Sequence, residues 1–244
     1  MFGLQKLPPR CSTLVLFGGS FDPPHRAHLE FARLIADRIP GAGVLMVPAA
    51  RSPHKAVSPG AAGFERVAML ERGLEDVGLD PKAVWTIELD RSGGGPSYWV
   101  ETVRQADKWV KRQAAVEQVR FVIGSDQLAA FDRWRDAHEI LALAGPIVLV
   151  RCDADTPVDA AVDEATIERV LGPIRASGHW SDEELALFAD GFIIGQPIRA
   201  VSSTRVRELL TQDPEAAELE TLLTPGVLGV IREHGLYREP RGGG

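Results

Sequence analysis

This sequence has few cysteines, no long apolar run and no excess of basic residues, and each shortage excludes a class of protein. The two cysteines, Cys11 and Cys152, form no Cys-x-x-Cys pair, so the usual zinc and redox motifs are absent. We expect two ordinary thiols, with a disulfide between them as the alternative. No apolar run approaches about 18 residues, so we expect no transmembrane helix. With a net charge of −7, the chain has no general attraction for nucleic acid or for anionic membranes.

The remaining composition is that of an ordinary globular protein. Apolar residues make up 45% and charged residues 25% of the 244 positions, which suffices for a sizeable core. The N-terminal segment is short and interrupted by proline, so we expect no signal peptide and place the protein in the cytoplasm. Any site for an anionic ligand must then be a local pocket of basic groups. The sequence leaves the oligomeric state open, a homo-oligomer included.

Strand-length apolar runs recur along the chain as far as Arg151, and helical periodicity fills the gaps between them. Expected strands cover Thr13–Gly19, Gly43–Pro48, Ala83–Leu89, Val119–Gly124 and Pro146–Arg151. Expected helices cover His28–Ile39, Phe64–Asp76, Tyr98–Arg112 and Leu128–Leu143. This alternation predicts an α/β fold with a doubly wound, Rossmann-like parallel sheet, helices on both faces and a C-terminal helical segment. Ligands of such sheets bind beyond the carboxyl ends of the strands.

We expect a single domain over residues 1–244. Its parts are an α/β core over 12–151, an insertion or helical region over 152–197, and C-terminal phosphate-binding and closing helices over 198–238. The pattern weakens in the middle region, from Asp153 to Gln196, where we expect surface helices, one of them with Ser181 as its N-cap.

The stretch LVLFGGSFDPPHRAH joins the first expected strand to the first expected helix. Gly18 and Gly19 at the strand end let backbone N–H groups approach a ligand closely. Two prolines delay the helix until about His25, and a helix N-terminus attracts phosphate through its unpaired N–H groups and its dipole. His25 and His28 lie on one face of the first turn and can donate to a polyphosphate. Taken alone, the pair could equally be a surface feature; a zinc site has less support, because no further ligand lies at zinc spacing.

A second anion site is expected at VSSTRVREL. Ser202, Ser203 and Thr204 are N-cap types before a helix, and their hydroxyl groups join the N–H groups of its first turn. Arg207 lies one turn further on and suits a phosphate. By itself this segment could also be a capped surface helix with an exposed arginine.

Three further segments follow expected strands. RSPHK brings His54 and Lys55 to the loop after the second strand, which could also be a solvated surface loop. Asp126 in GSD suits a ribose hydroxyl or an adenine amino group, or caps a helix. Trp134 in FDRW could stack on a ring or pack in the core.

Six segments, in this order, resemble the motifs of one family. They are GGSFDPPHRAH, VPAARSPHK, ELDRSGGGPSYWVETV, FVIGSDQLAAFDRW, VSSTRVR and LLTPGVLGVIREHGLY. The first is similar to the opening motif of the nucleotidyltransferases with a His-x-Gly-His signature. The set as a whole resembles the bacterial nicotinate-nucleotide adenylyltransferases over nearly the whole chain. One such motif would be a weak signal, whereas six in order are specific.

The resemblance implies an enzyme of NAD biosynthesis that moves AMP from ATP to the 5′-phosphate of nicotinate mononucleotide. The implied catalytic residues are His25, His28, Lys55 and Arg207. The implied ATP and phosphate contacts are Gly18, Gly19, Ser20, Asp126, Ser202, Ser203 and Thr204. The implied mononucleotide contacts are His54, Ser97, Tyr98, Trp99 and Trp134. Mg²⁺ would arrive with ATP, keeping its waters and taking phosphate oxygens, so no metal site on the protein is expected.

The chain departs from the family pattern at three places. Ala27 stands where the family has the glycine of His-x-Gly-His, and Trp99 stands where it usually has threonine. After the fifth expected strand only Arg151 remains of an Arg-Pro-Gly segment. Ala27 and Trp99 keep one alternative open, the same reaction on nicotinamide mononucleotide or another phosphate acceptor. A nucleotide-binding protein without catalysis is a second alternative. Asp22 has no clear chemical role, and we expect it to brace its loop by hydrogen bonds.

Overall fold

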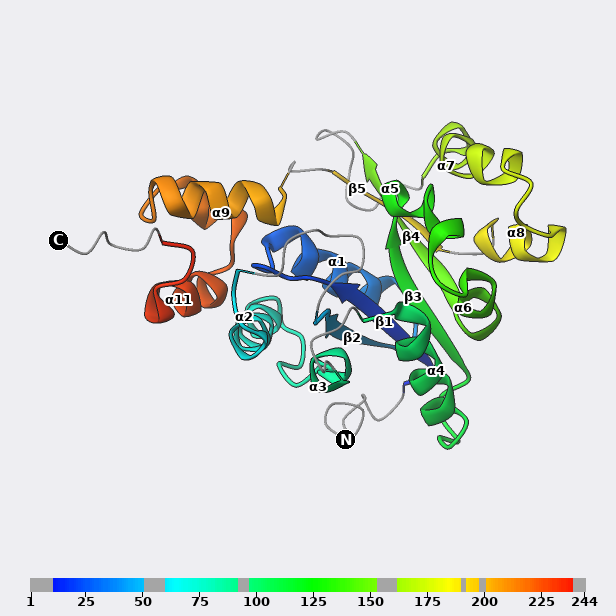
Figure 1. Cartoon of the computed structure of the whole chain (residues 1–244), viewed down its shortest axis with the longest axis horizontal. Helices are drawn as coiled ribbons and strands as arrows, with labels where there is room; N and C mark the ends of the chain where they lie inside the picture. The colour runs from blue at the N-terminus through cyan, green and yellow to red at the C-terminus, as the bar shows by residue number, and fades with distance from the viewer. Residues whose placement is uncertain are drawn as a thin grey trace. The chain divides into compact units, whose positions relative to one another are not determined.

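The computed structural model of the chain describes residues 11–50, 60–91, 97–152, 162–189, 192–197 and 201–238. For residues 151, 152, 189 and 192–197 it describes the backbone only. Within these ranges five strands form one sheet in the order β2-β1-β3-β4-β5. The strands are β1 (Thr13–Gly19), β2 (Ala42–Pro48), β3 (Gln118–Gly124), β4 (Gly145–Cys152) and β5 (Phe192–Pro197). The pairs β1–β3, β3–β4 and β4–β5 are parallel, and helices lie on both faces of the sheet (Figure 1), which confirms the predicted fold class.

Most predicted helices are found within a few residues of their expected bounds. The helices of the first half are α1 (Arg26–Arg38), α2 (Gly63–Asp76), α3 (Ile87–Arg91) and α4 (Trp99–Val110). Those of the second half are α5 (Ser125–Leu128), α6 (Ala137–Leu143), α7 (Glu164–Ala176), α8 (Asp182–Ala189), α9 (Ser203–Gln212), α10 (Glu218–Leu222) and α11 (Pro225–His234). The predicted N-cap of α8 is confirmed, because the Ser181 hydroxyl accepts from the Glu184 N–H at 3.2 Å.

The prediction of a strand over Ala83–Leu89 is wrong. Only a single bridge joins Val84 to Met46 of β2, and α3 begins at Ile87. The backbone turns because Thr86 starts the helix, accepting the Asp90 N–H at 2.9 Å on its carbonyl. Acidic residues in that first turn suit the positive end of a helix.

The predicted helix over Leu128–Leu143 is also wrong as a continuous element. It consists of the end of α5, a short 3₁₀ turn at Phe131–Arg133, and α6. Asp136 interrupts the helical path with a φ of 55°, in the left-handed region that a right-handed helix cannot pass through.

Strand β5 lies in the middle region where only helices were expected. Its sequence, FIIGQP, has a short apolar run before a glycine, which is too little for a pattern to identify. Its backbone pairs with β4 from Ile147↔Phe192 to Cys152↔Pro197. This pairing defines the strand, and the local sequence pattern does not contain it.

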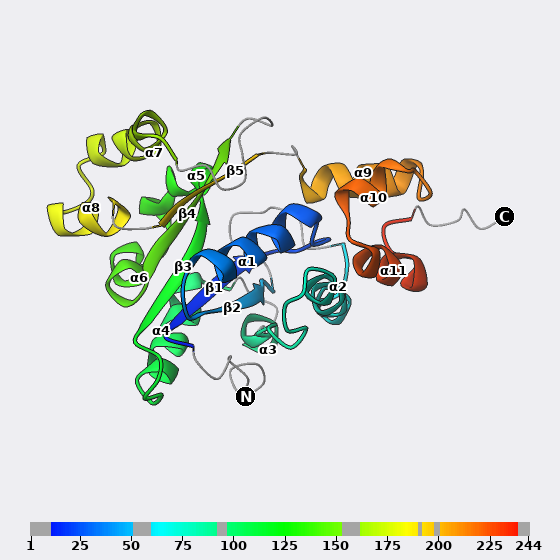
Figure 2. The same cartoon turned by 180° about the vertical axis from the view of Figure 1, so that it is seen from behind.

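The chain divides into two compact units. Unit 1 contains residues 18–97 and the C-terminal residues from 200 onward, and unit 2 contains residues 10–17 and 98–199. In unit 1, α2 and α11 lie side by side although they come from opposite ends of the sequence (Figures 1 and 2). In unit 2, α7 packs on α8, and α8 packs on β4. The expectation of a single domain stays a prediction.

Among the described helices, none is long and apolar enough to cross a membrane.

Candidate nucleotide site

The loop between β1 and α1 is the centre of the candidate site in unit 1. Its Phe21 has a φ of 47°, and its Asp22–Pro23 peptide bond is cis. The Phe21 ring packs against Gly19, where an added Cβ would lie 2.8 Å from Cζ of the ring. Gly19 is therefore needed for this packing, in addition to the close ligand approach that the sequence suggested.

The two predicted histidines do lie together. His25 is the N-cap of α1, and its ring stacks on that of His28 with centroids 3.7 Å apart. The His25 backbone N–H donates to Nδ1 of His28 at 3.2 Å. Because Nδ1 accepts this bond, the neutral His28 ring carries its proton on Nε2. His28 is half-buried and His25 is 6% exposed, so His28 is the better placed of the two to donate to a ligand.

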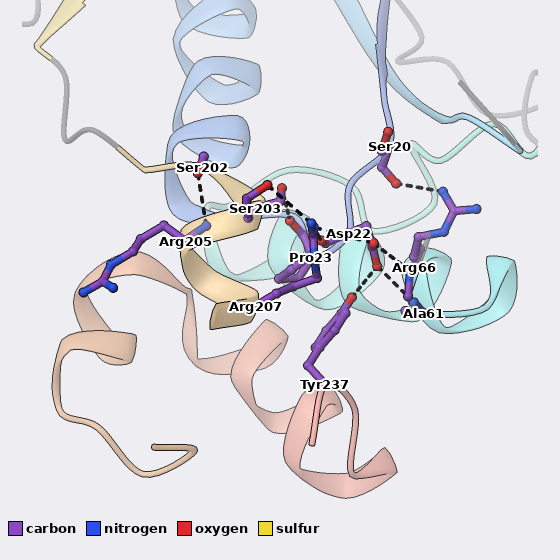
Figure 3. Close-up of polar contacts among 12 residues, drawn as sticks. Ser20, Asp22, Pro23, Ala61, Arg66, Ser202, Ser203, Arg205, Arg207 and Tyr237 are labelled. Carbon is purple, nitrogen blue, oxygen red and sulfur yellow. Dashed lines mark hydrogen bonds and ion pairs between the residues drawn. The ribbon is translucent and has the colours of Figure 1, made fainter. Parts of the chain in front are cut away.

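Asp22 braces the loop, as expected, and its carboxylate is buried at 5% exposure. Oδ2 accepts from the Gly60 N–H at 2.8 Å, and Oδ1 accepts from the Ala61 N–H at 3.0 Å. Oδ1 also accepts from the Tyr237 hydroxyl at 2.7 Å (Figure 3). The Asp22 carboxylate thus connects the first motif, the start of the segment before α2 and the turn that contains Tyr237.

Arg66 of α2 is a site residue that the sequence analysis missed. It is 2% exposed, and its Nη1 donates at 2.7 Å to the carbonyls of both Ser20 and Ala49. Burial lowers the pKa of the Arg66 guanidinium, and the nearby Asp22 carboxylate opposes this shift. The sequence pattern of an amphipathic helix does not distinguish a buried arginine from an exposed one, so it did not predict that Arg66 is buried.

We expect Arg66→Met to lower the free energy of unfolding by about 2–4 kcal/mol, because it leaves two buried carbonyls and the Asp22 charge without this partner. Urea unfolding would measure the loss. Arg72→Met is the matched control on the same helix, since Arg72 is exposed, and it should cost less than about 1 kcal/mol. Equal stabilities of the two variants would contradict the role given to Arg66.

The start of α9 lies against this loop. Ser202 caps the helix by accepting the Arg205 N–H at 3.1 Å, as predicted. The Ser203 hydroxyl donates to the Pro23 carbonyl at 2.9 Å, and Arg207 Nη1 donates to the Asp22 carbonyl at 2.6 Å. Arg207 Nη2 also donates to the Thr204 hydroxyl at 3.3 Å. The two predicted anion-binding helix starts are therefore neighbours (Figure 3).

Tyr237 is a second residue that the sequence analysis missed. Burial, together with the charge and hydrogen bond of Asp22, raises the pKa of its hydroxyl well above the usual value of 10.0. Its backbone has a φ of 60°, outside the range that most residues adopt. A tyrosine seven places from the end of a chain carries no local pattern that would place it at a site.

This pKa shift predicts a loss of stability at alkaline pH. Above about pH 10 the unfolded chain loses the Tyr237 proton while the folded chain keeps it, so stability falls as pH rises; below that pH the contribution is complete. Urea unfolding between about pH 8 and pH 10.5 should show a smaller alkaline loss in Tyr237→Phe than in the wild type. The tyrosinate absorbance of Tyr237 should appear only as the protein unfolds. Ionisation of Tyr237 in the folded protein would contradict this.

Asp126 belongs to unit 2, where it lies in the first turn of α5. The N-cap of that helix is Gly124, so the alternative that Asp126 is the cap is wrong. A Cβ added to Gly124 would lie 2.5 Å from Oδ1 of Asp126, so the glycine makes room for this carboxylate at the end of β3.

The predicted mononucleotide residues 97–99 occupy the start of α4. In unit 1, the Ser97 hydroxyl donates at 2.6 Å to Oε2 of the buried Glu88. In unit 2, Tyr98 is the N-cap of α4, and the Arg135 guanidinium lies 4.6 Å from the centroid of its ring. Such a cation–π contact holds the turn against the segment that follows α5.

Trp134 is half-buried at the edge of an aromatic cluster in unit 2. Its ring meets that of Phe131 edge-on at 5.3 Å, and Phe131 stacks on Trp180 at 5.5 Å. Phe188 of α8 closes the cluster against Trp180 at 5.3 Å. The region from 162 to 189 therefore supplies part of the packing behind Trp134, and the expected surface helices have a buried side.

His54 and Lys55 lie outside the described residues. Within the parts of the chain that the structure describes, no group of three or more His, Cys, Asp or Glu side chains could hold a metal ion.

The chain is similar to known proteins over nearly its whole length. Residues 16–209 match the family model of cytidylyltransferase-like proteins, and the chain belongs to that class of nucleotidyltransferase folds. A probable nicotinate-nucleotide adenylyltransferase of Stenotrophomonas maltophilia is 35% identical, over 94% of this chain and 98% of the relative. One of Pseudomonas fluorescens is 32% identical, over 92% and 97%. By these relatives the chain is a member of the nicotinate-nucleotide adenylyltransferase family.

Solved structures show the same fold at lower identity. The nicotinic acid mononucleotide adenylyltransferase of Plasmodium falciparum, in complex with NaAD, superposes with a TM-score of 0.62 at 15% identity, covering 93% of this chain and 97% of the other. A putative nicotinate-nucleotide adenylyltransferase of Vibrio parahaemolyticus has a TM-score of 0.55 at 17% identity, covering 94% and 97%.

Proposed function

We propose that this protein transfers AMP from ATP to the 5′-phosphate of nicotinate mononucleotide, giving nicotinate adenine dinucleotide and pyrophosphate. The observation that carries the proposal is the meeting of two helix starts. Ser203 and Arg207 of α9 donate to the Pro23 and Asp22 carbonyls just before α1. Two adjacent helix N-termini, two histidines and an arginine form a cradle for a chain of phosphates. The curated relatives supply the identity of the nucleotides.

The reaction requires that the two substrates be positioned and that their phosphate charge be neutralised. The mononucleotide phosphate is itself the nucleophile; an oxygen of it forms the new bond to the α-phosphorus of ATP while the bond to pyrophosphate breaks in line. No covalent intermediate on the protein is needed. The N–H groups of Gly18, Gly19 and Ser20 face the α-phosphate in this proposal.

The remaining phosphate contacts divide between the two helix starts. His28 donates through Nε2 to the charge that develops on the triphosphate, with His25 beside it. Ser202, Ser203, Thr204 and Arg207 hold the β- and γ-phosphates. Mg²⁺ is part of the MgATP substrate and would be held by phosphate oxygens and water.

The acceptor side of the site rests on residues that the structure describes only in part. Lys55 and His54 are proposed to bridge to the attacking phosphate. Ser97, Tyr98 and Trp99 are proposed to contact the pyridine carboxylate, with Trp134 stacking on the ring, and Asp126 to contact the adenosine. Trp99 in place of the family's threonine is the specific observation that favours a second candidate, the same reaction on nicotinamide mononucleotide.

Positional labelling tests the proposed reaction. With ATP labelled in the α-phosphate, Mg²⁺ and nicotinate mononucleotide, the label should appear in a dinucleotide; with the γ-phosphate labelled, it should appear in pyrophosphate. Label from the γ-phosphate in inorganic phosphate would instead indicate an ATPase, and would overturn the proposal. Location in the cytoplasm and any homo-oligomer stay predictions.

A further inference from the structure

We infer that Tyr237 is a positioning residue of the nucleotide site, acting through the Asp22 carboxylate. The inference rests on the proposed function for the identity of the site, and goes beyond it by assigning a task to the end of the chain. None of the residues proposed to touch a nucleotide lies beyond Arg207. Tyr237 lies on the turn that follows α11 and reaches back to the first motif (Figure 3).

Tyr237 contacts both segments that Asp22 joins. Its hydroxyl donates to Oδ1 of Asp22 at 2.7 Å. Its ring lies against Gly60, where an added Cβ would be 3.4 Å from Cε1. The Gly60 N–H in turn donates to Oδ2 of Asp22. The Asp22–Tyr237 pair therefore fixes Gly60 at the start of the segment before α2.

The Asp22 end of this pair contacts the Arg207 guanidinium, whereas the Tyr237 end is tied to the backbone of α9. Arg207 Nη1 donates to the Asp22 carbonyl at 2.6 Å and lies 3.7 Å from Oδ2 of the carboxylate. On the other side, the Thr211 hydroxyl lies 2.9 Å from the Arg207 carbonyl and 3.1 Å from the Tyr237 carbonyl. The direction of the Arg207 guanidinium therefore depends on where Asp22 is held, and Tyr237 helps to hold it.

Backbone conformation gives an independent indication. Among the described residues, three that are not glycine have a positive φ, and two of these, Phe21 and Tyr237, flank this carboxylate. Such conformations persist where the surrounding contacts determine them, and they concentrate at functional sites. The half-buried Tyr237 keeps its hydroxyl in direct contact with this carboxylate.

Tyr237→Phe removes only the hydroxyl and keeps the ring against Gly60. We expect kcat/KM for ATP to fall about tenfold, and the dissociation constant of ATP to rise severalfold, because Asp22 and Arg207 lose their fixed position. The melting temperature should fall by no more than about 2–4 °C. Thr211→Val is the matched control: it removes the other tether of the same turn and should change kcat/KM less than about threefold.

A double-mutant cycle separates positioning from mere anchoring. If Tyr237 acts through Asp22, Tyr237→Phe in the Asp22→Asn background should cause little further loss of kcat/KM, so that the two effects do not add. Additive losses, equal losses in Tyr237→Phe and Thr211→Val, or a Tyr237→Phe variant changed only in melting temperature would each overturn the inference. ATP binding is measured without acceptor, so the same cycle is also run in the dissociation constant of ATP. Failure of nicotinate mononucleotide to react with the wild type would overturn the proposed function, and the binding cycle would still test the role of Tyr237.

Discussion

Replacing His28 with alanine lowers kcat for the release of pyrophosphate by about 10²–10³-fold, while the KM for nicotinate mononucleotide changes little. The reason is the arrangement of the ring. Nδ1 accepts the His25 N–H at 3.2 Å, so the proton of the neutral ring is on Nε2, which is the proposed donor to the triphosphate. A donor that meets charge developing in the transition state affects kcat more than substrate binding.

His138→Ala is the control for this experiment. His138 lies in unit 2 with an exposed side chain and contacts Glu184 at 2.6 Å, so its loss should leave kcat within about threefold of the wild type. A His28→Ala enzyme that keeps most of its kcat would exclude His28 as the donor to the transition state. His28→Asn, whose side-chain amide can donate one hydrogen bond, should recover part of the loss.

Replacing Arg207 with methionine lowers kcat/KM for ATP by about 10²-fold. Two effects combine: the proposed phosphate contact is lost, and the Asp22 carbonyl loses a donor at 2.6 Å. Because the proposed pairing of the guanidinium with phosphate exists before and during the reaction, we expect KM for ATP to rise and kcat to fall. Steady-state kinetics with saturating nicotinate mononucleotide would measure both changes.

Arg205→Met is the matched control on the same helix. It removes the same charge from α9, but Arg205 is directed to Glu218 at 3.6 Å and its side chain is 48% exposed. Its kinetics should remain close to those of the wild type. Equal losses in the two variants would mean that the net charge of α9 matters and that the position of Arg207 does not.

Much of the fold could be predicted because continuous apolar runs and amphipathic helices are strong local signals. β1 was predicted with the same bounds that the structure has, and α2 to within one residue. Where the prediction failed, tertiary contacts decided the structure. Val84 and Trp85 look like a strand but meet β2 at one bridge, and β5 exists through its pairing with β4.

The site divides in the same way. The sequence predicted the residues that lie within motifs, from Gly18 to His28 and from Ser202 to Arg207. Glycine, histidine and N-cap residues in such motifs indicate a helix that starts at a strand end. Arg66 and Tyr237 could not be predicted. The packing of α2 and of the C-terminal turn brings these two side chains to Asp22 and its loop. No spacing of residues in the sequence predicts these contacts.

The most direct test of the central claim is the release of pyrophosphate from ATP and Mg²⁺ with nicotinate mononucleotide, with nicotinamide mononucleotide, or with no acceptor. We predict rapid release with nicotinate mononucleotide, and slow or no release in the other two mixtures. Release with the amide alone would move the specificity to the second candidate and implicate Trp99. No release with either acceptor would contradict the proposed function.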